Sequence, residues 1–259
     1  MHLHTISTRL HALFGRSTDP APVSGEVRAL FVDTFGEEGH DGDAPEHDAR
    51  DTGSIARACA RMARARTKRD LAELLAAEVK RYTLSNLEEM NARIEHTMRD
   101  LPEGYRERLR PFVREQIFGA HHRLLVLACN GATAGLHAAP DPAAVAYFAM
   151  VEEACRAKAR EKDPGYLYLK YLLAAFAMFV VEEPVHPVGT PFPGGQIVDV
   201  WDGTYLCPVR EMADDVPYSL CPFCPAKQST EPTFPWMRGQ RRERERQACL
   251  ANYWTNYKG

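Results

Sequence analysis

The sequence lacks the features that would assign this chain to several large classes of protein. Its first residues carry no apolar core followed by a small-residue cleavage site, so we expect no secretory signal. The net charge is only −3, from 32 basic and 35 acidic residues, which argues against a protein that coats DNA. No Rossmann glycine motif, Walker A motif or zinc-protease histidine motif occurs. Nucleotide and zinc-protease chemistry therefore lack their usual sequence marks.

Long apolar runs are also scarce. The longest covers residues 166–181, and Lys170 interrupts it. Because a membrane-spanning helix needs about 20 apolar residues, the run predicts a helix at the centre of a packed core and no membrane association. The seven cysteines are an odd number in a chain too long to be a small disulfide scaffold. With no export signal, we expect reduced thiols and a cytoplasmic protein.

Composition divides the chain into five segments. Apolar residues at helical spacing predict an amphipathic helix over residues 1–16. Clustered acids with Gly and Pro predict a linker over 17–53 that is largely disordered. Residues 54–184 have the pattern of a helical bundle, 185–230 that of a Cys-rich metal-binding module, and 231–259 form an Arg-rich tail.

The bundle segment carries clear start and stop signals. Ser54 is the expected N-cap of the first helix, whose apolar face we expect to continue as far as Tyr82. A later helix starts or kinks at Pro111 and stops at Asn130-Gly131. Asp141-Pro142 is typical of a further helix start. These signals predict a bundle of five to six helices.

The chain changes character after residue 183. Frequent Pro and Gly exclude long helices there, and Asp202-Gly203 predicts the turn of a β-hairpin whose second strand runs into Cys207. The predicted fold class is therefore mainly α: a five-to-six-helix bundle with a small C-terminal Cys-rich module of irregular and β-hairpin structure.

Three cysteines in this module have the spacing of a metal site. Cys207 is followed after thirteen residues by Cys221, and Cys224 comes three positions later. Two thiolates separated by two residues can hold one ion from a single turn, and a third from a hairpin end can join them. A tetrahedral ion needs a fourth ligand, for which His186 is the first candidate and Cys249 the second.

The spacing leaves the cofactor open. Three thiolates and one imidazole are typical of structural zinc, which we favour, and an iron–sulfur cluster is the alternative. A redox dithiol needs a βαβ fold, for which the 35 residues after Cys224 leave no room. The remaining alternative is buried reduced thiols, which also describes Cys59, Cys129 and Cys155.

Two basic stretches are candidate nucleic-acid contacts. Arg57, Arg61, Arg64 and Lys68 are expected to share a helix face, and the tail at 238–246 carries five Arg against two Glu. Neighbouring acids weaken both candidates. We therefore keep nucleic acid as a minor alternative and a protein partner as an open one, and the sequence does not give the oligomeric state.

The Cys-rich module resembles a known family. The resemblance rests on the run from His186 to Gly195, the segment from Tyr205 to Glu211, and Leu220-Cys221-Pro222-Phe223-Cys224-Pro225-Ala226-Lys227-Gln228. Over residues 186–228 they resemble the uncharacterised archaeal family called domain of unknown function 2115. The resemblance implies a lineage without an assigned activity. It also implies that the linker and tail are additions to the family's shared sequence, which favours His186 over Cys249 as the fourth metal ligand.

Three hypotheses follow. The first is an intracellular metalloprotein with a three-Cys plus His site, structural zinc supporting an interaction or assembly role. The second is an iron–sulfur enzyme or electron-transfer accessory protein. The third is a nucleic-acid-associated factor that uses the basic helices. No catalytic residue and no substrate can be named, so whether the chain is an enzyme stays open.

Overall fold

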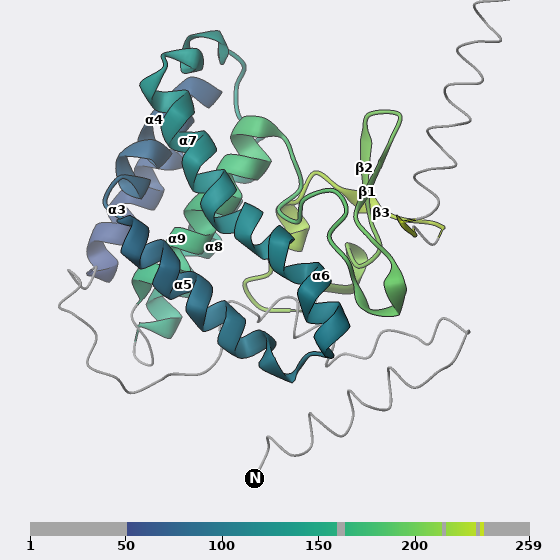
Figure 1. The fold of residues 1–259 in the computed structure, drawn as a ribbon. Coiled ribbons are helices and arrows are strands. Elements are labelled where there is room, and N and C mark those ends of the chain that lie inside the picture. The colour runs from purple at the N-terminus through teal and green to yellow at the C-terminus, as the bar shows by residue number, and fades with distance from the viewer. Residues whose placement is uncertain (1–50, 160–163, 214–215, 232–233, 236–259) are drawn as a thin grey trace, which may run out of the picture.

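The computed structural model describes residues 51–159, 164–213, 216–231 and 234–235. The predicted helix at 1–16, the linker up to residue 50, Cys249 and nearly all of the Arg-rich tail lie outside the described residues. The described part is mainly α, which confirms the predicted fold class. Helices pack side by side into one body, and a small sheet lies on one side of it, beyond α6 (Figure 1).

Within the described residues, seven α-helical segments make up the body. Their bounds are α3 Thr52–Met62, α4 Lys68–Val79, α5 Leu84–Thr97, α6 Glu103–Arg114, α7 Ala120–Cys129, α8 Ala143–Lys158 and α9 Pro164–Ala175. Two π-helical segments extend them: η2, Glu115–Gly119, joins α6 to α7, and η4, Phe176–Val181, continues α9. The described body thus consists of six helical rods, within the predicted number.

Helix α3, the first helix of the described body, begins earlier than the sequence pattern predicts. Asp51, not Ser54, is the N-cap, and its carboxylate accepts the Gly53 N–H at 3.1 Å. An aspartate at this position accepts a hydrogen bond from a backbone N–H that has no partner inside the helix. Its negative charge also interacts favourably with the positive end of the helix dipole. The expected continuous face up to Tyr82 is also broken. Thr67 and Asp70 form a capping box, with both bonds at 3.0 Å, that starts α4 as a separate helix.

The other helix start and stop signals in the sequence have different outcomes. Pro111 lies inside α6 and does not start the helix. The stop at Asn130-Gly131 is confirmed, since Gly131 has a left-handed φ of 66°. The helix start at Asp141-Pro142 is also confirmed: α8 begins at Ala143, and the Asp141 carboxylate accepts the Ala143 N–H at 2.8 Å.

The apolar run lies in the core, as predicted. Tyr168, Leu169 and Ala175 are all fully buried. Pro164–Val181 is long and apolar enough to span a membrane by length and composition, and 78% of it is buried inside the fold. That burial is what the central helix of a packed bundle requires.

The small sheet places Cys207 beside the last Cys-rich segment. Strand β1, Asp199–Trp201, pairs antiparallel with β2, Thr204–Cys207, through a turn in which Asp202 and Gly203 have φ of 48° and 72°. Positive φ at both central residues is the requirement of a type I′ hairpin turn, so the predicted hairpin is confirmed. Strand β3, Lys227–Gln228, runs parallel to β2 and pairs Gln228 with Cys207.

Side chains of the bundle fix the module to the body. The Tyr105 hydroxyl donates to the Pro191 carbonyl at 3.0 Å, and the Tyr171 hydroxyl donates to the Tyr218 carbonyl at 3.2 Å. The Phe223 ring stands edge-on to the buried Tyr147 ring, with the centroids 5.2 Å apart. The module is therefore packed onto the helices and is not a separate lobe.

Candidate functional site

The three predicted cysteine ligands lie in one small region. Cys207 ends β2 and is 5% exposed, whereas Cys221 and Cys224 bound the short η7 turn, Cys221–Phe223, and are half-buried. Cys207 and Cys224 pack in the same small apolar cluster around Phe192 and Val198. Arg210 joins the two cysteine segments, because its Nη2 donates to the Pro222 carbonyl at 3.1 Å.

Burial and neighbouring charges act in opposite directions on these thiols. Burial, with smaller contributions from Cys221 and Cys224, raises the pKa of Cys207 to about 12, while the Val209 N–H and Arg210 oppose the rise. Burial likewise raises the pKa of Cys224, and the backbone N–H groups of Ala226 and Val185 oppose it. Backbone N–H groups and a guanidinium thus favour the thiolate forms that burial disfavours.

The arrangement stops short of a formed metal site. Within the part of the chain that the structure describes, no group of three or more His, Cys, Asp or Glu side chains is arranged to hold a metal ion. The structure brings Cys207 and Cys224 into one cluster, whereas Cys221 and His186 line a cavity next to it. Metal binding at these four residues stays a prediction.

His186 lies on the chain between the body and the sheet. Its ring stands edge-on to Phe192, with the centroids 5.7 Å apart. Burial and the positive charge of Lys170 lower the pKa of His186 to about 4. The imidazole is therefore neutral at physiological pH, which is the form that binds metals.

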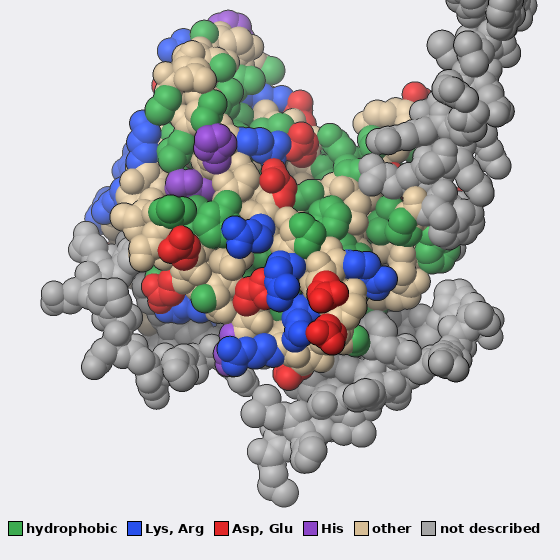
Figure 2. Space-filling model, in the orientation of Figure 1, with side chains coloured by type: hydrophobic (Ala, Val, Ile, Leu, Met, Phe, Trp, Pro, Cys, Tyr) green, Lys and Arg blue, Asp and Glu red, His purple; other side chains and the backbone are tan. Residues whose placement is uncertain are grey.

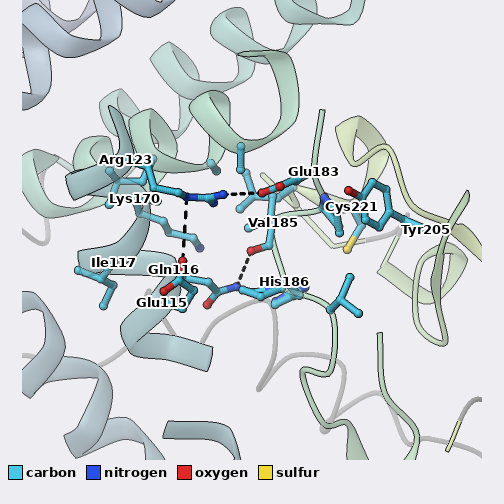
Figure 3. Close-up of a pocket in the computed structure, with 18 of the residues that line it drawn as sticks. Glu115, Gln116, Ile117, Arg123, Lys170, Glu183, Val185, His186, Tyr205 and Cys221 are labelled. Atoms are coloured by element: carbon cyan, nitrogen blue, oxygen red, sulfur yellow. Dashed lines mark hydrogen bonds and ion pairs between the residues drawn. The ribbon is translucent and has the colours of Figure 1, made fainter. Parts of the chain in front are cut away.

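A cavity of about 300 Å³ lies between part of the helical body and the module. Figure 3 shows Arg123 and Lys170 on one side of it and Cys221 and Tyr205 on the other. Arg123 donates through Nη1 to the Glu183 carboxylate at 2.8 Å, and its Nε lies 4.0 Å from Glu115. The apolar floor of the cavity is formed by residues of α5, η2, α7, α9, η4 and the module: Met90, Ile117, Ala120, Leu173, Ala174, Ala177, Val185 and Leu220.

Unusual backbone surrounds this cavity. Both π-helical segments contribute lining residues: η2 gives Glu115 and Gln116, and η4 gives Ala177. Two non-glycine residues with left-handed φ flank it, Glu182 at 63° and Tyr218 at 60°. Such conformations cost free energy and are concentrated at functional sites.

Sequence reasoning missed the cationic wall of the cavity. Arg123 and Lys170 carried no motif, although Lys170 was the one charge inside the apolar run. The structure pairs the Glu183 carboxylate with Arg123.

Other candidate residues lie elsewhere. Cys59 and Cys155 are buried, as expected of reduced core thiols, whereas Cys129 is exposed. The basic stretch does not share one helix, because α3 ends at Met62 and Lys68 begins α4 and pairs with Glu182 at 2.7 Å. On the face in view in Figure 2, basic and acidic side chains are interspersed over α5 and α6, with no field of one sign.

The comparison with known proteins gives a family without an assigned activity. Residues 67–229 match the family described as an uncharacterised protein conserved in archaea, DUF2115. A UPF0305 protein of Methanopyrus kandleri is 48% identical over 75 residues, 27% of this chain and 53% of the relative. One from Methanothermobacter thermautotrophicus is 46% identical over 61 residues, 24% of this chain and 39% of the relative.

The family match extends well beyond the cysteine module. The chain spans about half or less of the length of these curated relatives. No solved structure matches the chain. The family match covers α4 through β3, so the helical body from α4 onward and the Cys-rich module belong to the shared domain. The chain is therefore a member of the uncharacterised archaeal family DUF2115.

Proposed function

We propose that this chain is a metalloprotein in which Cys207, Cys221 and Cys224 hold one metal centre, zinc in preference to an iron–sulfur cluster. The observation that carries the proposal is the surroundings of the sulfurs. Backbone N–H groups of Val209 and Ala226 face the thiols of Cys207 and Cys224, each from two residues further along the chain. Such donors stabilise sulfur that carries negative charge.

The repeated Cys-Pro dipeptide supports this assignment. Each of the three cysteines is followed by Pro, which has no N–H, so the next residue along is the first that can donate to the sulfur. Among the buried core thiols, Cys155 has no N–H donor among the groups that shift its pKa, and the one N–H in this role at Cys59 is its own. A bound cation would supply the charge that burial of these thiolates requires, and its binding would release protons.

The proposal requires the sulfurs to close around the ion. Cys221 faces the cavity, so a turn of the η7 segment would have to bring it to Cys207 and Cys224. His186 is the preferred fourth ligand, because its neutral imidazole borders the same cavity as Cys221. Cys249 stays the alternative. A closed site of this type would hold β2, β3 and η7 together and so support an interaction or assembly role.

Metal analysis of the full chain tests this function. We expect about one equivalent of zinc per chain after purification with and without oxygen, the stoichiometry of a single tetrahedral site. Cys207→Ser, Cys221→Ser and Cys224→Ser should each lose the metal, whereas Cys155→Ala, the matched change at a buried core cysteine, should keep it. A brown protein containing iron and sulfide would instead favour the cluster. Failure to retain either metal, even after anaerobic reconstitution, would contradict the proposal.

Two further variants identify the fourth metal ligand. His186→Ala should lower zinc affinity, and Cys249→Ser should leave it unchanged. The reverse result would transfer the fourth ligand to the tail. Competition with a chromophoric chelator measures both affinities on the full chain.

A further inference from the structure

The cavity beside the cysteines has the composition of a ligand site in its own right. Its volume of about 300 Å³ is at the lower end of the range for small-molecule pockets. Apolar side chains from five helical segments, α5, η2, α7, α9 and η4, form its floor, and a few polar side chains converge at one side (Figure 3). Pockets of this composition bind molecules with a hydrocarbon body and one polar head.

The polar side of the cavity favours an acidic head group. Two cations from different helices line it, Arg123 of α7 and Lys170 of α9. The neighbouring carboxylates are already engaged with Arg123, since Glu183 accepts from Nη1 at 2.8 Å and Glu115 lies 4.0 Å from Nε. Among the described residues the Nη2 group of Arg123 donates no hydrogen bond, so this guanidinium keeps donors for a further carboxylate.

The backbone around the cavity provides a second, independent argument. π-Helical turns from two neighbouring helices meet at this one cavity, and each adds a residue relative to a regular α-helix. The Glu115 carboxylate lies over Gly119, where an added Cβ would stand 2.3 Å from it. The missing side chain at Gly119 thus leaves room for Glu115 to fold back beside Arg123.

We propose that this cavity binds a small carboxylic acid with a hydrocarbon body, whose carboxylate lies between Arg123 and Lys170. The hydrocarbon part contacts Ile117, Leu173 and Ala177 on the floor. Cys221 and His186 border the same space, so the ligand would lie next to the cysteine region. The two proposals are nevertheless independent, because acid binding uses the cations and the apolar floor and needs no metal.

Three probes with the same hydrocarbon body test the head group. Octanoate, octanol and octylamine are titrated separately into the full chain by isothermal calorimetry, before and after removal of metal with a chelator. We expect one octanoate per chain, weaker binding of octanol and weaker still of octylamine, with or without metal. Tighter binding of octylamine than of octanoate would overturn the proposal, and so would the absence of octanoate binding.

Variants locate the bound acid. Lys170→Met and Arg123→Met should each weaken octanoate binding by about tenfold or more, because a charge-assisted hydrogen bond is lost, and should leave octanol binding unchanged. Lys80→Met, at an exposed lysine outside the cavity, is the matched control and should have no effect. Ala177→Phe should fill the floor and abolish binding, with thermal unfolding confirming that the variant folds. Unchanged octanoate affinity in both charge variants would overturn the site even if Ala177→Phe does not fold.

Discussion

The guanidinium of Arg123 donates to the carboxylate of Glu183 at 2.8 Å, across 60 residues of chain. This ion pair joins α7 to the segment that leaves the central helix and begins the module. It also forms one edge of the cavity. Both side chains are more than a third exposed, at 41% and 37%. Their importance therefore lies in positioning rather than in stability.

The first prediction concerns the energy of this pair. A double-mutant cycle with Arg123→Met and Glu183→Gln should give a coupling free energy of unfolding below about 1 kcal/mol, because water screens exposed ion pairs. Urea unfolding of the four proteins measures it. A coupling above about 2 kcal/mol would mean that the pair holds the module to the body.

A second prediction separates the two candidate caps of α3. Asp51→Ala should lower the free energy of unfolding by about 1 kcal/mol, because the Gly53 N–H loses its acceptor. Ser54→Ala, inside the first turn, should be neutral or slightly stabilising, because Ala has the higher helix propensity. Chemical denaturation of both variants provides the comparison. A larger loss in Ser54→Ala would restore the cap that the sequence pattern suggested.

A third prediction uses two glycines that both have open space around them. Gly131 has φ of 66°, and an added Cβ at Gly131 or at Gly104 would meet no heavy atom within 4 Å. Gly131→Ala should therefore destabilise the fold by about 1 kcal/mol through backbone strain alone. Gly104→Ala, in the first turn of α6, should stabilise it by up to about 1 kcal/mol. Thermal unfolding should shift in opposite directions for the two variants, and a shift in the same direction would contradict the assigned conformations.

A fourth prediction concerns the buried thiols of the core. Burial raises the pKa of Cys59 and of Cys155 to about 12. Iodoacetamide at mildly alkaline pH should therefore label exposed Cys129 much faster than either, because the thiolate is the reacting form. Peptide mass spectrometry of the native chain quantifies the labelling, and denatured protein is the control. Equal rates in the native chain would mean that the core opens readily.

The same pKa values set a direction for alkaline stability. The folded state holds the two thiol protons more tightly than the unfolded state does. Their contribution to stability is therefore fully present below the ordinary thiol pKa, and it is lost as pH rises from there towards about 12. Cys155→Ala should flatten this alkaline decline in urea unfolding, whereas a variant of exposed Cys129 should not.

A fifth prediction concerns the buried Tyr147. Its hydroxyl donates to the Tyr171 carbonyl at 2.7 Å, and the side chain is fully buried. Tyr147→Phe should lower the free energy of unfolding by about 1 to 2 kcal/mol, because it removes the donor while the rings around it stay packed. Tyr205→Phe is the matched control, since its hydroxyl makes no hydrogen bond within the described part of the chain and should contribute little. Equal losses of unfolding free energy in the two variants would mean that the buried Tyr147 hydrogen bond contributes nothing to stability.

Much of the fold could be predicted because its signals are local. Asn130-Gly131, Asp141-Pro142 and Asp202-Gly203 each act over a few residues through backbone conformation, and all three are confirmed. The cap at Ser54 was wrong because an aspartate three residues earlier competes for the same orphan N–H groups. The continuous face up to Tyr82 was wrong because apolar periodicity alone does not register the Thr67–Asp70 capping box.

By itself, the amino-acid sequence determined the mainly α class, the central buried helix, the hairpin that ends at Cys207 and the grouping of three cysteines in one module. Periodicity, turn chemistry and spacing act within one element or between neighbours, so they can be read along the chain. Only the tertiary structure decided that Arg123, Lys170 and Glu183 line one cavity and that Cys221 and His186 border it. Those side chains come from α7, α9 and the segment after η4, and their meeting depends on how whole helices pack, which no short stretch of sequence encodes.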